Sequence, residues 1–258
     1  MLITNSELKY LQSIKKEKVR EHKDKFIIEG WHLIYEAVKS NVSVEFVALT
    51  KEAIKPETKT ILELIRSKGL PVKEISQRQL SKISDTVHSQ GIIALVRKKS
   101  INFDEPFLSN SKLVIACSRL NDPGNLGTII RTGEWFAIDY LLLSKGSVSP
   151  YNQKVIRSTA GAIFNVKVME NVDLENIIPV FKSKGLKVIA TSIAGRPLYS
   201  TKLPEKMLLL LGSESHGLEE KLLEQADEII KIPKYGKVDS LNVAIACGIF
   251  LSHYRSSY

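Results

Sequence analysis

The 258-residue sequence predicts an α/β protein built from two domains. Apolar segments of strand length alternate with segments of helical spacing in both halves, as in sheets that are covered by helices. Two segments, 112–117 (KLVIAC) and 206–211 (KMLLLL), are apolar on both faces, as strands buried in a parallel sheet are. A polar segment at 101–110 is expected to be a linker. We therefore expect one domain at 1–100 and another at 111–258.

The first hundred residues read as a small α/β sandwich. A charged helix over 5–24 is indicated by the apolar stripe of Leu8, Leu11 and Ile14, and Gly69 is expected to end a later helix. The other elements expected here are strands at 26–29, 44–49, 72–75 and 91–96 and helices at 31–39, 57–68 and 77–83.

Charge indicates a polyanionic partner. The formal net charge is +9 with a pI of about 9.4, and +7 of it lies in residues 1–100. A basic cluster at 15–25 is suited to contact a phosphate backbone. Aromatic residues do not alternate with these cations, so the cluster does not indicate base stacking.

Several classes are disfavoured by composition. No apolar run approaches the length of a membrane span, and the N-terminus has no signal-peptide core. Cys117 and Cys247 both lie in apolar stretches, which favours a reducing compartment such as the cytoplasm over a disulfide framework. His and Cys residues show no metal-ligand spacing, so no metal is expected.

The second half reads as a doubly wound domain, with a ligand site expected at the carboxyl ends of its strands. After the strand at 112–117 comes a loop rich in turn formers, where Asn125 is expected to cap a helix over 126–136. Arg131 is the lone cation in the middle of that helix. Further strands are expected at 140–143 and 187–191, and further helices at 152–161 and 174–183.

A glycine-rich loop, GSESHGL at 212–218, follows the strand at 206–211. Leu218 follows Gly217, so this is not a phosphate-binding Walker loop, and no dinucleotide fingerprint occurs in the chain. Gly217 would let a ligand approach the backbone, and Glu214 could bind a ligand amine or hydroxyl.

The stretch IPKYGKVDSLNVAIACGI, at 232–249, reads as a polar loop that leads into a buried helix. Ser240 stands where an N-cap is expected, and Asn242 just inside the helix needs a polar partner.

Three stretches together resemble a known family: NDPGNLGTIIRT at 121–132, LLLGSESHGL at 209–218 and IPKYGKVDSLNVA at 232–244. They are similar to the three motifs of the SpoU/TrmH branch of the SPOUT RNA methyltransferases. The connector SPYNQKVIRSTAGA at 149–162 also resembles this family. FIIEGWHLIYEAV and HSQGIIALV, in the N-terminal half, resemble its L30e-like substrate-binding domain.

The resemblance implies methyl transfer from S-adenosylmethionine to a ribose 2′-hydroxyl of RNA, by a homodimer whose catalytic domain contains a deep trefoil knot. It implies catalytic roles for Arg131, Asn125, Glu214, Ser240 and Asn242. It implies that the cofactor contacts Thr191, Gly212, Ile232 and Leu241, largely through backbone groups.

The family proposal makes the arginine the base, but a guanidinium is always charged in proteins. Our interpretation is that Arg131 holds the adjacent phosphate and stabilises the developing alkoxide. Three positions depart from the family pattern: Gly133 replaces alanine, Ala137 replaces glycine, and Lys234 replaces an apolar residue.

Two other classes compete with the methyltransferase. One is a non-catalytic RNA-binding protein, which the intact Arg131, Glu214, Ser240 and Asn242 argue against. The other is a nucleotide-dependent enzyme, which the missing phosphate fingerprints argue against. Among RNA substrates, the separate basic domain favours ribosomal RNA over transfer RNA, and no base code is readable in the sequence.

Overall fold

The computed structural model describes residues 1–20, 22–101, 109–213 and 216–258. Most of the expected linker, at 102–108, lies outside the described residues. Among those described, no helix is long and apolar enough to cross a membrane.

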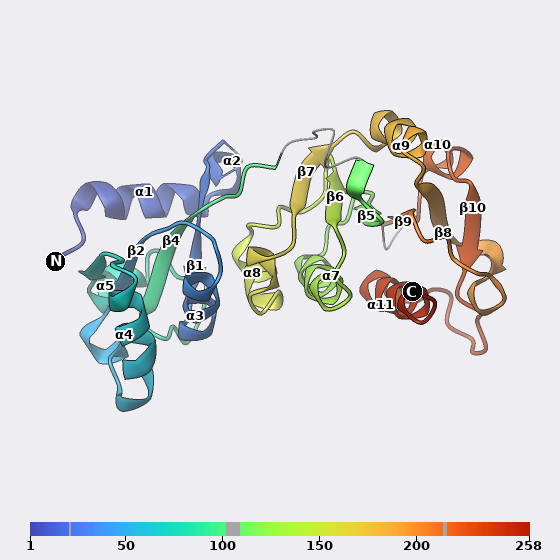
Figure 1. The fold of residues 1–258 in the computed structure, drawn as a ribbon. Helices are drawn as coiled ribbons and strands as arrows, with labels where there is room; N and C mark the ends of the chain where they lie inside the picture. Colours follow the sequence, from blue (N-terminus) through green and yellow to red (C-terminus); the bar gives the residue numbers. More distant parts are fainter. Residues whose placement is uncertain (21, 102–108, 214–215) are drawn as a thin grey trace. The chain divides into compact units, whose positions relative to one another are not determined.

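The chain folds into two compact units, and both combine helices with a sheet, which confirms the predicted α/β class (Figure 1). Unit 1 comprises Met1–Ser100 together with Tyr151–Asn165. Unit 2 comprises Ile101–Pro150 and Val166–Tyr258. The expected boundaries placed residues 151–165 in the second domain, 111–258. The contacts within the chain place them in unit 1 instead.

Unit 1 contains a four-stranded sheet in the order β1-β4-β2-β3. β4 pairs antiparallel with both β1 and β2, whereas β3 pairs parallel with β2. The strand bounds are Lys25–Glu29 for β1, Val44–Leu49 for β2, Val72–Glu74 for β3 and Ile92–Arg97 for β4.

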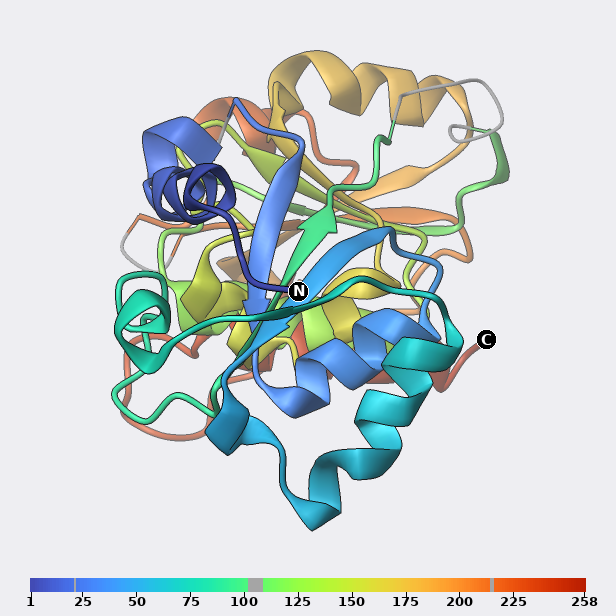
Figure 2. The same cartoon turned by 90° about the vertical axis from the view of Figure 1, so that its left-hand side faces the viewer.

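Helices lie on both faces of this sheet (Figure 2). Leu11 and Ile14 pack with Ile27, Phe46 and other residues of one face in a buried cluster. Because side chains alternate along a strand, Phe26 and Val47 point to the other face. The helix bounds are Asn5–Lys15 for α1, Glu17–Arg20 for α2, Trp31–Lys39 for α3, Lys59–Ser67 for α4 and Gln77–Leu80 for α5.

The prediction of one helix over 5–24 is wrong, because the backbone is extended at Lys16 (ψ 129°), where α1 ends. The break turns Arg20 inward, where its Nη1 donates to the Lys15 carbonyl at 3.1 Å. Lys98 Nζ donates in turn to the Arg20 carbonyl at 3.0 Å. Arg20 is therefore a structural residue of this unit, although the sequence placed it in a solvated basic cluster.

Residues 151–165, which include α8 (Gln153–Ser158), pack within unit 1. The Tyr151 ring lies 4.7 Å from the ring of Phe26, and Lys98 Nζ lies 4.6 Å from the Tyr151 ring centroid. Lys99 Nζ donates to the carbonyl of Phe164 at 2.6 Å. An aromatic pair and two lysines thus attach this connector to the first hundred residues.

Unit 2 contains a six-stranded parallel sheet in the order β10-β8-β9-β5-β6-β7. β5 and β9 are its central pair, and every residue of both is buried, as their apolar sequences predict. The strand bounds are Leu113–Cys117 for β5, Tyr140–Ser144 for β6, Val168–Val172 for β7, Lys187–Pro197 for β8, Met207–Leu211 for β9 and Glu228–Lys231 for β10.

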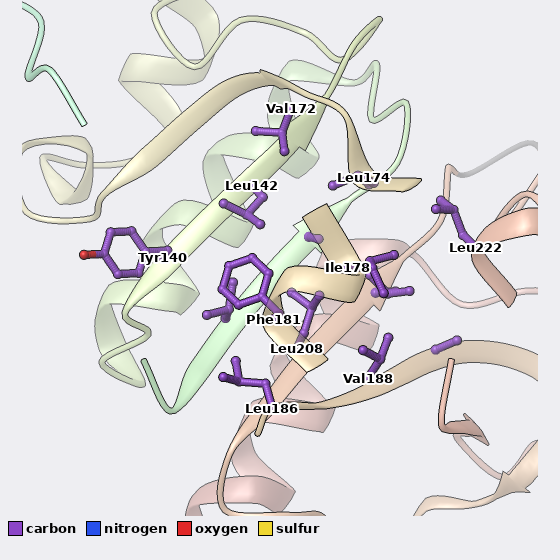
Figure 3. Close-up of a cluster of buried hydrophobic side chains, with 14 of the residues drawn as sticks. Tyr140, Leu142, Val172, Leu174, Ile178, Phe181, Leu186, Val188, Leu208 and Leu222 are labelled. Carbon is purple, nitrogen blue, oxygen red and sulfur yellow. The ribbon is translucent and has the colours of Figure 1, made fainter. Parts of the chain in front are cut away.

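One face of this sheet packs against α9 and α10 (Figure 3). Phe181 and Ile178 of α9 are fully buried against Leu142 and Leu208 of the strands. In unit 2, α7 and α11 lie on the other side of the sheet (Figure 1). The helix bounds are Pro123–Trp135 for α7, Leu174–Ser183 for α9, Glu220–Glu224 for α10 and Val243–Arg255 for α11.

Two of the departures from the family pattern meet at the carboxyl end of α7. The amides of Ala137 and Ile138 donate to the carbonyls of Glu134 and Gly133, which forms a Schellman cap. Ala137 holds the left-handed conformation (φ 49°) that glycine would adopt without strain. A Cβ at Gly133 would lie 2.5 Å from Ile138 Cδ1, so glycine there makes room for Ile138.

Candidate active site

A cavity of about 680 Å³ opens in unit 2 at the carboxyl ends of β9 and β10 and beside the middle of β8. Three chain segments far apart in sequence form it: residues 191–193, residues 211–213 with 216–218, and residues 230–243. Ala246 and Phe250 of α11 complete its wall. The site lies where a doubly wound sheet binds ligands, because parallel strands direct all their following loops to one edge.

The four residues predicted to contact a cofactor all line this cavity. They are Thr191, Gly212, Ile232 and Leu241, and Ser240 lines it as well. The Thr191 hydroxyl donates to the Leu210 carbonyl at 3.0 Å, which ties β8 to β9 at the cavity edge. Their roles toward a cofactor stay predictions, but the folded chain brings them to one place.

Gly212 is required by the close return of the loop that follows β9. Ser213 and Gly217 exchange two backbone hydrogen bonds, of 3.1 and 3.0 Å. A Cβ on Gly212 would lie 2.2 Å from the carbonyl carbon of Gly217 and 2.4 Å from the amide nitrogen of Leu218. Both neighbours are backbone atoms, so this wall of the cavity can form only with glycine at 212.

The N-cap of α11 is Asn242, so the prediction that Ser240 caps this helix is wrong. The Asn242 side-chain oxygen accepts from the amides of Ala244 and Ile245, at 2.9 and 3.3 Å. Asn and Ser are similar in capping preference, and the local sequence does not decide between them. Ser240 lies two residues before the cap and lines the cavity instead.

The N-cap of α7 is Asp122, so the prediction that Asn125 caps it is also wrong. The Asp122 carboxylate accepts from the Asn125 amide at 2.8 Å, and Pro123 occupies the first helical position. Proline is favoured there because it lacks the amide hydrogen that would go unpaired. Asp-Pro was the sequence signal for this boundary.

The two asparagines predicted as supporting polar groups contact each other. Asn242 Nδ2 donates to Asn125 Oδ1 at 2.9 Å, which links the first turn of α7 to the N-cap of α11. This hydrogen bond joins two sequence stretches more than a hundred residues apart. It provides the polar partner that the sequence indicated Asn242 needs.

Arg131 is exposed on α7 and is not among the residues that line the cavity. No hydrogen bond or ion pair joins it to any residue that the structure describes. Within this single chain, Arg131 is therefore not brought to Asn125, Ser240 or Asn242 by direct contact. Glu214, the remaining predicted catalytic residue, lies outside the described residues.

The electrostatics of the cavity are mildly positive. Lys231 and Lys234 line it, and Lys234 lies 4.0 Å from the carboxylate of Asp239. Burial raises the pKa of the Cys247 thiol in α11 to about 12, so the thiol stays protonated and is no nucleophile. Among the described residues, no group of His, Cys, Asp or Glu is arranged to hold a metal ion.

Residues 15–25 are less available to a polyanion than the sequence suggests. Lys15 pairs with Asp85 at 2.5 Å, and Lys25 pairs with Glu45 at 2.7 Å. Lys16, Lys18 and Lys23 remain exposed. Three of its six cations, Lys15, Lys25 and the buried Arg20, therefore serve the internal structure of unit 1.

The cavity fits the cofactor that the sequence resemblance implies. Its volume lies within the roughly 300–1,000 Å³ usual for small-molecule sites. Leu211, Leu218 and Phe250 offer buried apolar surface for an adenine ring, while Ser240 and the loop backbones offer hydrogen-bond groups. Gly212 packs closely against the backbone of Gly217 and Leu218, so backbone groups form one wall of the cavity. Contact with the cofactor through backbone groups requires such a wall.

Sequence reasoning missed the apolar side chains at the mouth of the cavity, Ile193, Tyr235 and Val238. No periodic pattern marks them, because Tyr235 and Val238 lie in an irregular segment and Ile193 lies in β8 beyond the strand expected at 187–191. Only the folded positions of β8 and of the loop at 232–242 reveal that they share one rim.

We expect Asn242→Asp and Asn242→Ala to separate capping from the asparagine pair. Aspartate caps a helix as well as asparagine but cannot donate to Asn125 Oδ1, so stability should hold while methyl transfer falls. Alanine loses both the helix cap and the hydrogen bond to Asn125, and loss of the cap lowers the free energy of unfolding by about 1 kcal/mol. Thermal unfolding and turnover of the three proteins check this; equal activity of Asn242→Asp and the parent would show that turnover does not need the Asn242 amide as a donor.

Comparison with known proteins agrees with the geometry. Residues 112–252 match the SpoU rRNA Methylase family, and residues 5–94 match the MRM3-like substrate binding domain. The chain is 31% identical over 260 residues to the 23S rRNA (guanosine(2553)-2'-O)-methyltransferase RlmP of Bacillus subtilis, covering 96% of this chain and 100% of that protein.

Solved structures agree over the whole length. A putative RNA methyltransferase of the TrmH family from Porphyromonas gingivalis superimposes with a TM-score of 0.85 at 25% identity, covering 100% of both chains. An AdoMet-bound rRNA methyltransferase from Sinorhizobium meliloti gives 0.83 at 26% identity, covering 99% of this chain and 96% of that one. With the family match extending over more than half of its residues, this chain belongs to the SpoU rRNA methylase family.

Proposed function

We propose that this protein transfers a methyl group from S-adenosylmethionine to a ribose 2′-hydroxyl of RNA. The observation that carries the proposal is the single cavity that gathers Thr191, Gly212, Ile232, Ser240 and Leu241 from three separate stretches of sequence. Membership of the SpoU family supports the same reaction. Bound in the cavity, the cofactor would supply the methyl group from its sulfonium centre, whose sulfur leaves readily as a neutral thioether.

The chain's own task is to position the acceptor and to stabilise its charge. The loops at 211–213 and 230–243 would hold the donor through backbone groups, largely shielded from water. The Asn125–Asn242 hydrogen bond fixes the starts of α7 and α11 relative to each other. Arg131 would donate hydrogen bonds to the RNA phosphate and to the 2′-oxygen, whose proton passes to solvent water as the bond to the methyl group forms.

We infer that the active form is a homodimer. Arg131 lies between two other exposed residues on one side of α7, Thr128 and Trp135, and Trp135 is 84% exposed. Ile245 of α11 is 54% exposed. Apolar side chains exposed on α7 and α11 are typical of a surface that pairs with a second copy. Such pairing would place Arg131 of one copy beside the cavity of the other copy.

A trefoil knot in unit 2 is part of the proposal. Its support is membership of the SpoU family. Within the unit, β8 and β10 pass closely: an added Cβ on Gly195 would lie 2.6 Å from backbone atoms of Ile229 and Ile230. The pairing of β10 with β8 shifts register beside this point, which leaves residues 191–195 out of the ladder. Those residues and the loop at 232–242 could therefore wrap around the same ligand.

Ribosomal RNA is the proposed substrate, with transfer RNA as the alternative. The name of the Bacillus subtilis relative states action on 23S rRNA. The separate unit 1, with its excess of cations, suits a large folded RNA. The cytoplasm is the proposed location, which agrees with the two free buried cysteines.

The decisive experiment is transfer of tritium from labelled S-adenosylmethionine to total RNA that lacks the modification, followed by sizing of the RNA. We expect label in large ribosomal RNA, released as a 2′-O-methylated nucleoside on digestion. Label in transfer RNA would support the proposed reaction but replace ribosomal RNA by transfer RNA as the substrate. RNA binding without any transfer would favour the non-catalytic alternative instead.

A further inference from the structure

Three apolar side chains form an exposed rim at the mouth of the cavity. Tyr235 is 89% exposed, Ile193 is 80% exposed and Val238 is 71% exposed, yet all three line the cavity. Side chains that line a cavity while facing solvent must lie at its entrance, unlike the buried Leu211 and Phe250. We call these three residues the entrance rim.

The ring of Tyr235 has no partner among the residues that the structure describes. It makes no hydrogen bond or ring contact with any residue that the structure describes. A single exposed aromatic residue needs no explanation, but three exposed apolar residues around one entrance form a patch, and such patches mark binding surfaces.

The rim is surrounded by positive charge. Lys231 and Lys234 line the cavity, Lys237 is exposed between Tyr235 and Val238, and Asp239 is the one acid in this segment. Residues 231–239 therefore carry a net charge of +2. An aromatic ring flanked by lysines is the combination that binds unpaired nucleic acid, because the ring stacks on a base while the cations meet phosphates.

We propose that Tyr235 stacks on a nucleobase of the RNA at or next to the methylated nucleotide, and that this enzyme acts on unpaired RNA. The inference rests on the proposed function, because the ribose must reach the cavity entrance if the methyl donor lies inside. A base is covalently attached to that ribose, so it must lie near the rim. In a duplex both faces of a base are covered by its neighbours, so only an unpaired base offers a face to Tyr235.

The test compares wild type with Tyr235→Ala, Tyr235→Phe and Tyr199→Ala. The acceptor is an unmodified transcript of large ribosomal RNA, and its KM is measured with tritiated S-adenosylmethionine. We expect Tyr235→Ala to raise the KM for RNA about 5- to 100-fold. The cofactor Kd, from equilibrium dialysis, should change less than about twofold. Tyr235→Phe keeps the ring and should restore the KM, whereas Tyr199, exposed but outside the cavity, controls for loss of any surface tyrosine.

A second readout does not depend on catalysis. Filter binding gives the Kd of each protein for labelled single-stranded poly(U) and for a labelled poly(A)·poly(U) duplex. We expect Tyr235→Ala to bind poly(U) more weakly than wild type does, and both proteins to bind the duplex equally. If wild type binds the transcript but transfers nothing, the proposed function fails while these two Kd values still test stacking.

Three results would overturn the inference. An unchanged KM and an unchanged Kd for poly(U) in Tyr235→Ala would exclude stacking. A loss of cofactor affinity as large as the rise in KM for RNA would show that Tyr235 contacts S-adenosylmethionine rather than the RNA. Conversion of a dimer to a monomer by Tyr235→Ala, seen by light scattering, would assign the rim to a second copy of this chain.

Discussion

Arg131→Ala should lower the kcat for methyl transfer by about 10²- to 10³-fold, the usual effect of removing one donor that stabilises a developing oxyanion. The cofactor Kd should stay unchanged, because Arg131 does not line the cavity of its own chain and is proposed to contact the RNA rather than the donor. Single-turnover methylation and equilibrium dialysis separate the two quantities. Thr128→Ala, one turn earlier and also exposed on α7, is the matched control and should keep near-parental turnover.

Arg131→Lys distinguishes the two roles proposed for this residue. Lysine keeps a positive charge but loses the planar fork that can hold a phosphate and the 2′-oxygen together. We expect turnover between those of the parent and the alanine variant, and near-normal turnover would exclude a bidentate role. Because Arg131 lies on the surface proposed to pair with a second copy, light scattering must show that each variant keeps its oligomeric state.

Gly212→Ala should disrupt the cavity and lower stability together. The new Cβ would lie 2.2 Å from the carbonyl carbon of Gly217, so the returning loop must move by about 1 Å to restore ordinary contact near 3.4 Å. Overpacking of this kind lowers the free energy of unfolding by about 1–3 kcal/mol. A shift of about 1 Å at a site can reduce kcat/KM by about 10²-fold.

Gly236→Ala is the matched control for Gly212→Ala. Gly236 also lines the cavity, but a Cβ there meets no atom within 4 Å. Its stability should remain within about 0.5 kcal/mol of the parent, as at most surface positions. Thermal unfolding with and without S-adenosylmethionine measures both effects. Parental stability and cofactor affinity in Gly212→Ala would show that the loop can move freely and plays no structural part in the cavity.

Local sequence was sufficient for most of the secondary structure. The helices α3 and α9 and the strand β2 have the predicted bounds, because their apolar spacing and flanking breakers act within a few residues. The buried strands β5 and β9 were recognisable from their continuous apolar runs. Failures occurred where neighbouring residues compete, as Ser240 and Asn242 do for the α11 cap.

The sequence by itself also determined the family from three ordered motifs. The motifs at 209–218 and 232–244 carry residues now found around one cavity, and the motif at 121–132 meets the last of them through Asn125 and Asn242. Only the tertiary structure decided which of those residues meet. Asn125 contacts Asn242, whereas Arg131 stays exposed and apart from the cavity in this single chain. Residues 151–165 join unit 1, and Tyr235 reaches the cavity entrance. Such positions depend on contacts between segments far apart along the chain, and the pattern of neighbouring residues does not encode those contacts in readable form.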